Sequence, residues 1–135
     1  MTVMRGNYDK ARLRKMDAEH HIHPFTNNRQ NVEQGGALIF ARADGVYIWD
    51  VDNKRYLDGM AGLWCVNVGY GREELVEAAN RQMRELPYYS SFFGSSTPAT
   101  VELTGKITSL LGHDLQHVFF ANSGSEANDS AIKMI

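Results

Sequence analysis

The stretch that most restricts the fold is an apolar run that passes through a polar turn into a helical pattern. Residues 118–121 form an apolar run of strand length, and Ser123 and Glu126 supply the Ser-x-x-Glu pattern that opens many helices. A buried strand followed by a glycine turn and a helix is the beginning of an α/β domain. We therefore predict a buried strand over residues 118–121 and an α/β fold.

The preceding part of the chain has the patterns of helices and of a small sheet. Apolar residues recur at helical spacing over residues 73–86, and again between the Thr97 cap and the Gly112 stop. A short polar helix is expected over residues 8–20, followed by a loop around Pro24. Turns rich in Asp, Asn and Gly separate three strand-like runs, which predict an antiparallel meander: 37–41, 46–49 and 55–57.

Composition and motif spacing exclude several classes of partner. The chain has 135 residues, 43% hydrophobic and 22% charged, a size that permits one core but not two independent domains. A net charge of −2 without charged blocks argues against nucleic acid and membrane partners. His20, His21 and His23 lack the spacing of a metal site, so no metal is expected. A single cysteine, Cys65, and no apolar leader favour a cytoplasmic protein.

The turn after residues 118–121 has the chemistry of an anion site. The first N–H groups of a helix lack intrahelical partners and lie at the positive end of the helix dipole, where phosphate binds. Gly124 lets a phosphate approach the backbone, and the Ser125 hydroxyl adds a charge-assisted hydrogen bond. The same pattern also opens helices that bind nothing, and it lacks the further residues of Walker and dinucleotide loops. From the local sequence alone, both interpretations stay open.

Several motifs in a fixed order resemble the class III (omega) aminotransferases, which depend on pyridoxal 5′-phosphate. The phosphate-cup motif of that family is matched by residues 122–128 (Asn-Ser-Gly-Ser-Glu-Ala-Asn), and its N-terminal hairpin by residues 45–50 and 54–59. The similarity extends from about His23 to the last residue. It implies the aspartate aminotransferase-like α/β fold, fold type I of the pyridoxal-phosphate-dependent transferases.

The resemblance also implies a division into domains and a cofactor site. Residues 1–70 would be an N-terminal segment of the small domain, with a helix and small antiparallel strands. Residues 71–135 would be the truncated beginning of the large cofactor-binding domain. Gly124 and Ser125, together with Ser123, would hold the phosphate of pyridoxal 5′-phosphate.

Five apolar residues are implied to line the substrate site. Their segments are most similar to the branch that acts on omega-amino acids or uses amines with pyruvate. Phe25, Leu63 and Trp64 would form walls of the amine pocket, and Phe92 or Phe93 would reach the neighbouring subunit's site across a dimer interface. Large apolar side chains in irregular segments suit such walls. Without the resemblance, Trp64, Phe92 and Phe93 would be expected in the core.

The implied activity moves an amino group from an amine or omega-amino acid to a keto acid such as pyruvate, in a homodimer or higher oligomer with shared active sites. None of the lysines falls in the family's Schiff-base motif, and residues 126–135 end in mid-helix without a cap. We therefore expect the chain to be truncated before that lysine, and to be inactive by itself. Two alternatives stay open: another reaction on the same scaffold, such as decarboxylation or an aminomutase shift, and a non-catalytic phosphate-binding or dimerisation module.

Overall fold

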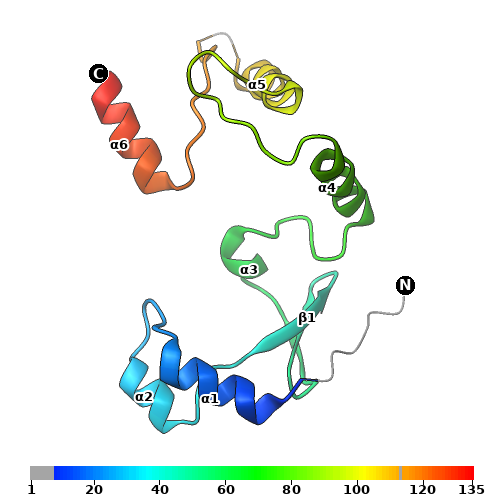
Figure 1. Cartoon of the computed structure of the whole chain (residues 1–135), viewed down its shortest axis with the longest axis vertical. Coiled ribbons are helices and arrows are strands. Elements are labelled where there is room, and N and C mark those ends of the chain that lie inside the picture. The colour runs from blue at the N-terminus through cyan, green and yellow to red at the C-terminus, as the bar shows by residue number, and fades with distance from the viewer. Residues whose placement is uncertain (1–7, 113) are drawn as a thin grey trace. The chain divides into compact units, whose positions relative to one another are not determined.

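A computed structural model describes residues 8–112 and 114–135 (Figure 1). These residues form two compact units, and the division between Asn80 and Arg81 falls inside a helix, α4 (Glu73–Glu85). The first unit contains α1 (Lys10–His20), α2 (Asn28–Glu33), β1 (Phe40–Asp44), β2 (Tyr47–Asp50), β3 (Arg55–Leu57) and α3 (Ala61–Trp64). The second unit contains α5 (Pro98–Leu111) and α6 (Gly124–Met134). The helices predicted over residues 8–20, 73–86 and 97–112 are confirmed to within two residues at each end, whereas α2 and α3 were not predicted.

The three strands form an antiparallel sheet in the order β1-β2-β3, which confirms the predicted meander. Phe40 pairs with Asp50, and a bulge separates that pair from the rest of the β1–β2 ladder. The first strand begins at Phe40, so the predicted start at Ala37 is wrong. Because β2 ends at Asp50, no strand continues opposite residues 37–39 in the described part of the chain.

Asp50 closes the turn between β2 and β3. Its side chain is buried, and its carboxylate accepts hydrogen bonds from the backbone N–H groups of Asp52 and Lys54 and from the Tyr56 hydroxyl, each 2.9 Å long. Burial opposes ionisation and is the largest single influence on this carboxyl. The hydrogen bonds from Lys54, Tyr56 and Asp52 together outweigh it and hold the pKa of Asp50 below its ordinary value.

Charged side chains connect α1 to the same turn. Asp9 caps the helix by accepting a 3.0 Å hydrogen bond from the Arg12 N–H. Asp52 forms ion pairs with Lys10, at 3.3 Å, and with Arg14. All three side chains of this cluster are well exposed, so the pairs orient α1 more than they stabilise it.

Local sequence indicates where both helices of the second unit begin and where α5 ends. Thr97 caps α5 by accepting from the Thr100 N–H, Pro98 occupies the first turn, and Gly112 ends the helix with a φ of 90°. Ser123 caps α6 through the Glu126 N–H. These caps depend on residues within one turn of each other, which explains why the sequence predicts them.

The strand predicted over residues 118–121 is wrong for this structure. Residues 115–121 have no regular secondary structure, and both Phe119 and Phe120 are exposed. A strand needs a neighbouring strand to accept and donate its ladder hydrogen bonds. The described residues of this unit contain no such neighbour.

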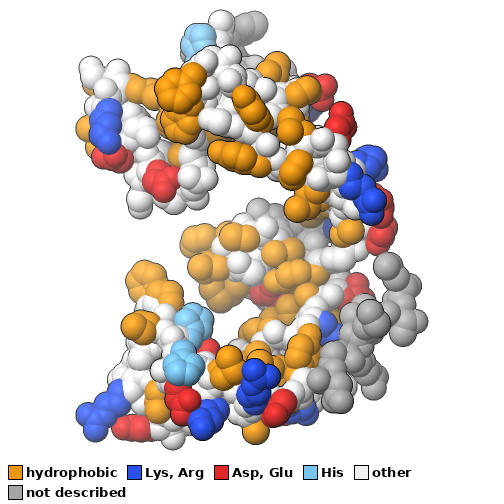
Figure 2. All heavy atoms as spheres, in the orientation of Figure 1, with side chains coloured by type: hydrophobic (Ala, Val, Ile, Leu, Met, Phe, Trp, Pro, Cys, Tyr) orange, Lys and Arg blue, Asp and Glu red, His pale blue; other side chains and the backbone are white. Residues whose placement is uncertain are grey.

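Few described side chains are withdrawn from solvent. Only Asp50 and Val51 are buried among the described residues, although the chain's length permits a core. Every residue of α4 is exposed, so its predicted apolar stripe has no packing partner here. Figure 2 shows hydrophobic side chains at the surface of both units. Among the described residues, no helix combines the length and apolar character required to cross a membrane.

Candidate functional site

The start of α6 is organised by Ser123. Its hydroxyl accepts a 3.2 Å hydrogen bond from the Glu126 N–H, and its carbonyl accepts one of 3.0 Å from the Ala127 N–H. The Glu126 carboxylate reaches back to the Asn122 N–H at 3.0 Å. Ser123 therefore caps the helix as predicted, whereas Glu126 accepts from the Asn122 N–H and not from the Ser123 N–H that a capping box would use. Together these bonds set the direction in which the helix begins.

Two N–H groups of this turn remain free for a ligand. The backbone N–H groups of Gly124 and Ser125, and the Ser125 hydroxyl, make no hydrogen bond with any described residue. A Cβ added at Gly124 would meet no atom within 4 Å, and Gly124 is not among the residues with positive φ. Neither sterics within the chain nor backbone conformation therefore demands glycine there. The approach to the first N–H groups of α6 is open, which is the geometry that an anion site needs.

The segment labelled α3 is not a regular right-handed helix but a left-handed turn, and it presents Leu63 and Trp64. The φ angles of Ala61, Gly62, Leu63 and Trp64 are 48°, 59°, 59° and 65°. For a residue with a side chain, this conformation costs about 1–2 kcal/mol. Three such residues, with Gly62 among them, persist only where surrounding contacts hold them.

Asp58 supplies those contacts. Its Oδ2 atom accepts hydrogen bonds from the Gly62 N–H at 2.8 Å and from the Tyr70 hydroxyl at 2.7 Å, and its Oδ1 atom accepts from the Met60 N–H at 3.2 Å. The bond from Tyr70 is the largest influence on this carboxyl and lowers the pKa of Asp58. The same bond raises the pKa of the Tyr70 hydroxyl. We did not predict Asp58 or Tyr70 from the sequence, where the dense glycines nearby were the only signal.

Both backbone conformation and close neighbours favour glycine at position 62. A Cβ on Gly62 would lie 3.0 Å from the Tyr70 hydroxyl and 3.0 Å from the Val66 Cγ2 atom. Its φ of 59° is also the conformation that favours glycine. An added Cβ would therefore require the Tyr70 hydroxyl or the Val66 side chain to move by a few tenths of an ångström.

The predicted wall residues of this turn are available for contact. Leu63 lines an apolar cavity of about 490 Å³, together with Phe40, Arg42, Ile48, Asp58 and Met60. Trp64 is 78% exposed, so it is not a core residue of the described chain. The neighbouring Cys65 is also exposed.

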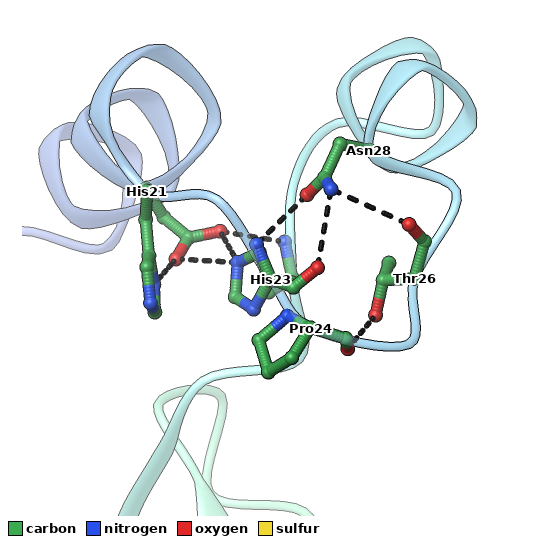
Figure 3. Close-up of polar contacts among 7 residues, drawn as sticks. His21, His23, Pro24, Thr26 and Asn28 are labelled. Atoms are coloured by element: carbon green, nitrogen blue, oxygen red, sulfur yellow. Dashed lines mark hydrogen bonds and ion pairs between the residues drawn. The ribbon is translucent and has the colours of Figure 1, made fainter.

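Phe25 lies in a loop that is closed by polar groups of its neighbours, and Figure 3 shows the contacts of His23, Pro24, Thr26 and Asn28. The Asn28 side chain accepts from the His23 N–H at 2.9 Å and donates to the His23 carbonyl at 3.1 Å. The Thr26 hydroxyl donates to the Pro24 carbonyl at 3.0 Å. Phe25 has a φ of 52° and is fully exposed, so this loop displays an aromatic ring without packing it.

Phe92 and Phe93 lie in the second unit, in the connection between α4 and α5. They are 72% and 102% exposed, and their ring centroids are 6.2 Å apart. Phe92 lines a cavity of about 380 Å³ with Ser91, Ser95, Ser96, Thr100 and Val118. The interpretation of these phenylalanines as core residues therefore does not hold for the described chain.

The predicted site residues fall into separate groups within their own units. Leu63 and Trp64 share one turn of the first unit, where Phe25 lies in another loop. In the second unit, Phe92 and Phe93 are adjacent, and Ser123, Gly124 and Ser125 form the start of α6.

Comparison with known proteins identifies relatives over most of the chain. The family described as aminotransferase class-III matches residues 29–135. Putrescine–pyruvate aminotransferase of Pseudomonas aeruginosa is 50% identical over 98% of this chain and 29% of its own length. Gamma-aminobutyrate transaminase 1 of Oryza sativa subsp. japonica is 41% identical over 83% of this chain and 22% of its own. This chain thus spans less than a third of either relative.

Solved structures agree with the described fold. An (S)-enantioselective omega-transaminase from Thermomicrobium roseum is 43% identical, with a TM-score of 0.91 over 96% of this chain and 29% of its own. An omega-transaminase from Pseudomonas jessenii, solved in complex with PMP, is 39% identical, with a TM-score of 0.86 over 90% of this chain and 27% of its own. At these identities and scores, this chain has the fold of the corresponding part of those enzymes.

Proposed function

Because the chain belongs to the class III aminotransferases, we propose that the protein carrying it moves an amino group from an amine or omega-amino acid to a keto acid such as pyruvate. The family and the aspartate aminotransferase-like fold type are those expected from the sequence. The 50% identity to an enzyme named for putrescine and pyruvate supports an amine donor and pyruvate as the acceptor.

The observation that carries this proposal is the open start of α6. Class III aminotransferases depend on pyridoxal 5′-phosphate, and the Gly124 and Ser125 N–H groups with the Ser125 hydroxyl suit its phosphate. When bound, the cofactor supplies the electron sink for exchange of the amine nitrogen. The residues of this chain would hold the phosphate end in a fixed position and leave the reacting end free.

Phe25, Leu63 and Trp64 would hold the carbon skeleton of the amine. Their exposure leaves their apolar surfaces available, and apolar walls orient a substrate that offers few polar groups. Phe92 and Phe93 would serve the site of the other subunit in a homodimer. Clustered exposed aromatic side chains of this kind mark binding surfaces.

The proposed function also implies how the chain is divided between domains and in which cellular compartment the protein works. Residues 1–70 would belong to the small domain and residues 71–135 to the start of the large one. The observed division lies slightly later, between Asn80 and Arg81. The exposed free thiol of Cys65 fits a reducing compartment, so we propose the cytoplasm.

The activity is tested on the full-length protein with added pyridoxal 5′-phosphate, a short diamine and pyruvate. Alanine should form in step with loss of the diamine. Release of carbon dioxide from an amino acid, or a shift of its amino group without a keto acid, would instead show another reaction of the scaffold. The absence of any of these products would favour a non-catalytic module.

Trp64 should set which amines fit. In the full-length protein, Trp64→Ala should change the ratio of kcat/KM between an aromatic and a short straight-chain amine by roughly 10- to 200-fold, as expected for an apolar wall. Alanine keeps a Cβ, so the cost of the left-handed backbone stays nearly the same. The control is Trp49→Ala, which removes an indole from β2, where it stacks against Arg42 at 3.7 Å. Equal loss for all amines would assign Trp64 to stability alone.

A further inference from the structure

Asp17 is the centre of a polar network that joins three separate segments. Its carboxylate accepts from His21 Nδ1 at 3.1 Å, from His23 Nε2 at 3.0 and 3.1 Å, and from the Ala37 N–H at 3.2 Å. These donors lie at the end of α1, in the loop that follows, and just before β1. The Asp17 side chain is only 13% exposed, which strengthens hydrogen bonds to its charge. Figure 3 shows both imidazoles directed at this carboxylate.

The network is what fixes the loop of Phe25 to the rest of the first unit. The bonds between His23 and Asn28 close the loop on itself, and they do not attach it to α1 or to the sheet. Among the hydrogen bonds of the described residues, those from His23 to Asp17 make the attachment. The Ala37 N–H holds the same carboxylate from the other side, so Asp17 has a defined position.

Phe25 depends on this attachment more than an ordinary loop residue would. Its φ of 52° is unfavourable for a side chain of its size, and no ring contact of Phe25 is recorded among the described residues. A strained, exposed residue keeps one position only where its neighbours hold the backbone on both sides. Here His23 lies two residues before Phe25, and Asn28 three residues after it.

We propose that Asp17 is a positioning residue, which holds the loop of Phe25 through His23 and thereby sets the preference among amines. This inference rests on the proposed function, in which Phe25 is a wall of the amine pocket. Asp17 would touch neither substrate nor cofactor. Its effect would reach the amine only through the position of the Phe25 ring.

A metal ion bound by Asp17, His21 and His23 is the alternative explanation of this cluster. Asp17, His21 and His23 each offer a ligand atom, and these atoms lie within 4.8 Å of one another. A divalent cation of the zinc type accepts such ligands. The observed separations of 3.0–3.1 Å are those of direct hydrogen bonds between the rings and the carboxylate, so the geometry favours the network without a metal.

The test compares Asp17→Asn with Asp52→Asn in the full-length, cofactor-loaded protein without an affinity tag. Both changes remove one negative charge that holds α1, but only the first touches the loop. Asp17→Asn should speed amide hydrogen exchange over residues 21–28 by about tenfold or more, as for loss of a bond to a charged group. It should also change the ratio of kcat/KM between an aromatic and a straight-chain amine at least about fivefold, a shift of the size an apolar wall produces. Asp52→Asn should change neither quantity.

Four results would overturn the proposal. These are unchanged exchange in Asp17→Asn, an equal rise in Asp52→Asn, faster exchange with an unchanged amine ratio, and a wild-type protein that reproduces the Asp17→Asn behaviour after treatment with a chelator. The last result would assign the network to a metal. If the wild-type protein transfers no amino group, the proposed function fails, and hydrogen exchange alone then decides whether Asp17 holds the loop.

Discussion

Replacing Ser125 by alanine in the full-length protein should weaken retention of pyridoxal 5′-phosphate by roughly 10- to 150-fold while leaving the fold intact. The hydroxyl has no partner among the described residues, so its removal breaks no bond within them. A hydrogen bond to a charged group contributes about 1.5–3 kcal/mol, which corresponds to that range. Equilibrium dialysis against graded cofactor concentrations, followed by measurement of bound cofactor, gives the affinity.

The matched control is Ser109→Ala. The Ser109 hydroxyl donates a 2.7 Å hydrogen bond to the Lys106 carbonyl in α5, away from the start of α6. Its loss should leave cofactor affinity unchanged. If Ser125→Ala binds the cofactor as tightly as the wild-type protein does, Ser125 does not belong to the phosphate site.

Mixed dimers should regain activity that neither parent variant has. One variant lacks the lysine that bonds to the cofactor, and the other carries Phe92→Ala and Phe93→Ala. If Phe92 and Phe93 serve the opposite subunit, one of the two sites in a mixed dimer combines an intact lysine with intact phenylalanines. Alanine formation from an amine and pyruvate should then rise from near background toward half the wild-type rate per dimer.

The exposure of the segment motivates this experiment. Tyr88, Tyr89, Phe92 and Phe93 are 78%, 58%, 72% and 102% exposed, and so much apolar surface rarely stays in water. The control is a mixture of the lysine-deficient variant with a Tyr47→Ala variant. Tyr47 is an exposed aromatic residue of β2, outside the segment tested. The Tyr47→Ala variant should be active by itself, so mixing should produce no recovery of lost activity. Verified exchange of subunits without a gain in activity would assign the phenylalanines to their own subunit.

Sequence reasoning succeeds here where a structure depends on residues close together in the chain. The Ser123 and Thr97 caps and the β1–β2–β3 meander each follow from a few neighbouring residues. Residues 118–121 show the limit. Their apolar pattern predicts a buried strand, but a strand exists only beside a partner, and the pattern carries no information about where that partner lies.

The candidate site residues also fall into those that local sequence predicts and those that depend on distant residues. Gly124 and Ser125 could be placed from the local motif, because the start of a helix generates its own free N–H groups. The left-handed turn of Leu63 and Trp64 could not. Asp58 binds the turn locally through Gly62, but Asp58 is itself held by Tyr70, twelve residues later in the chain. Asp17 was not predicted either. Its partners His21 and His23 are near in sequence, but its bond to Ala37 spans twenty residues.

The left-handed turn also limits how this pocket can change in evolution or in engineering. At positions 63 and 64, a new residue alters both the shape of the wall and the ease with which the backbone stays left-handed. Glycine and asparagine favour that backbone, whereas valine, isoleucine and threonine resist it strongly. Two side chains of similar volume can therefore differ widely in yield of folded protein. The side chains that these positions accept easily are therefore few. If Trp64 is the wall proposed above, glycine removes the indole at the lowest backbone cost and is the easiest change toward a wider pocket.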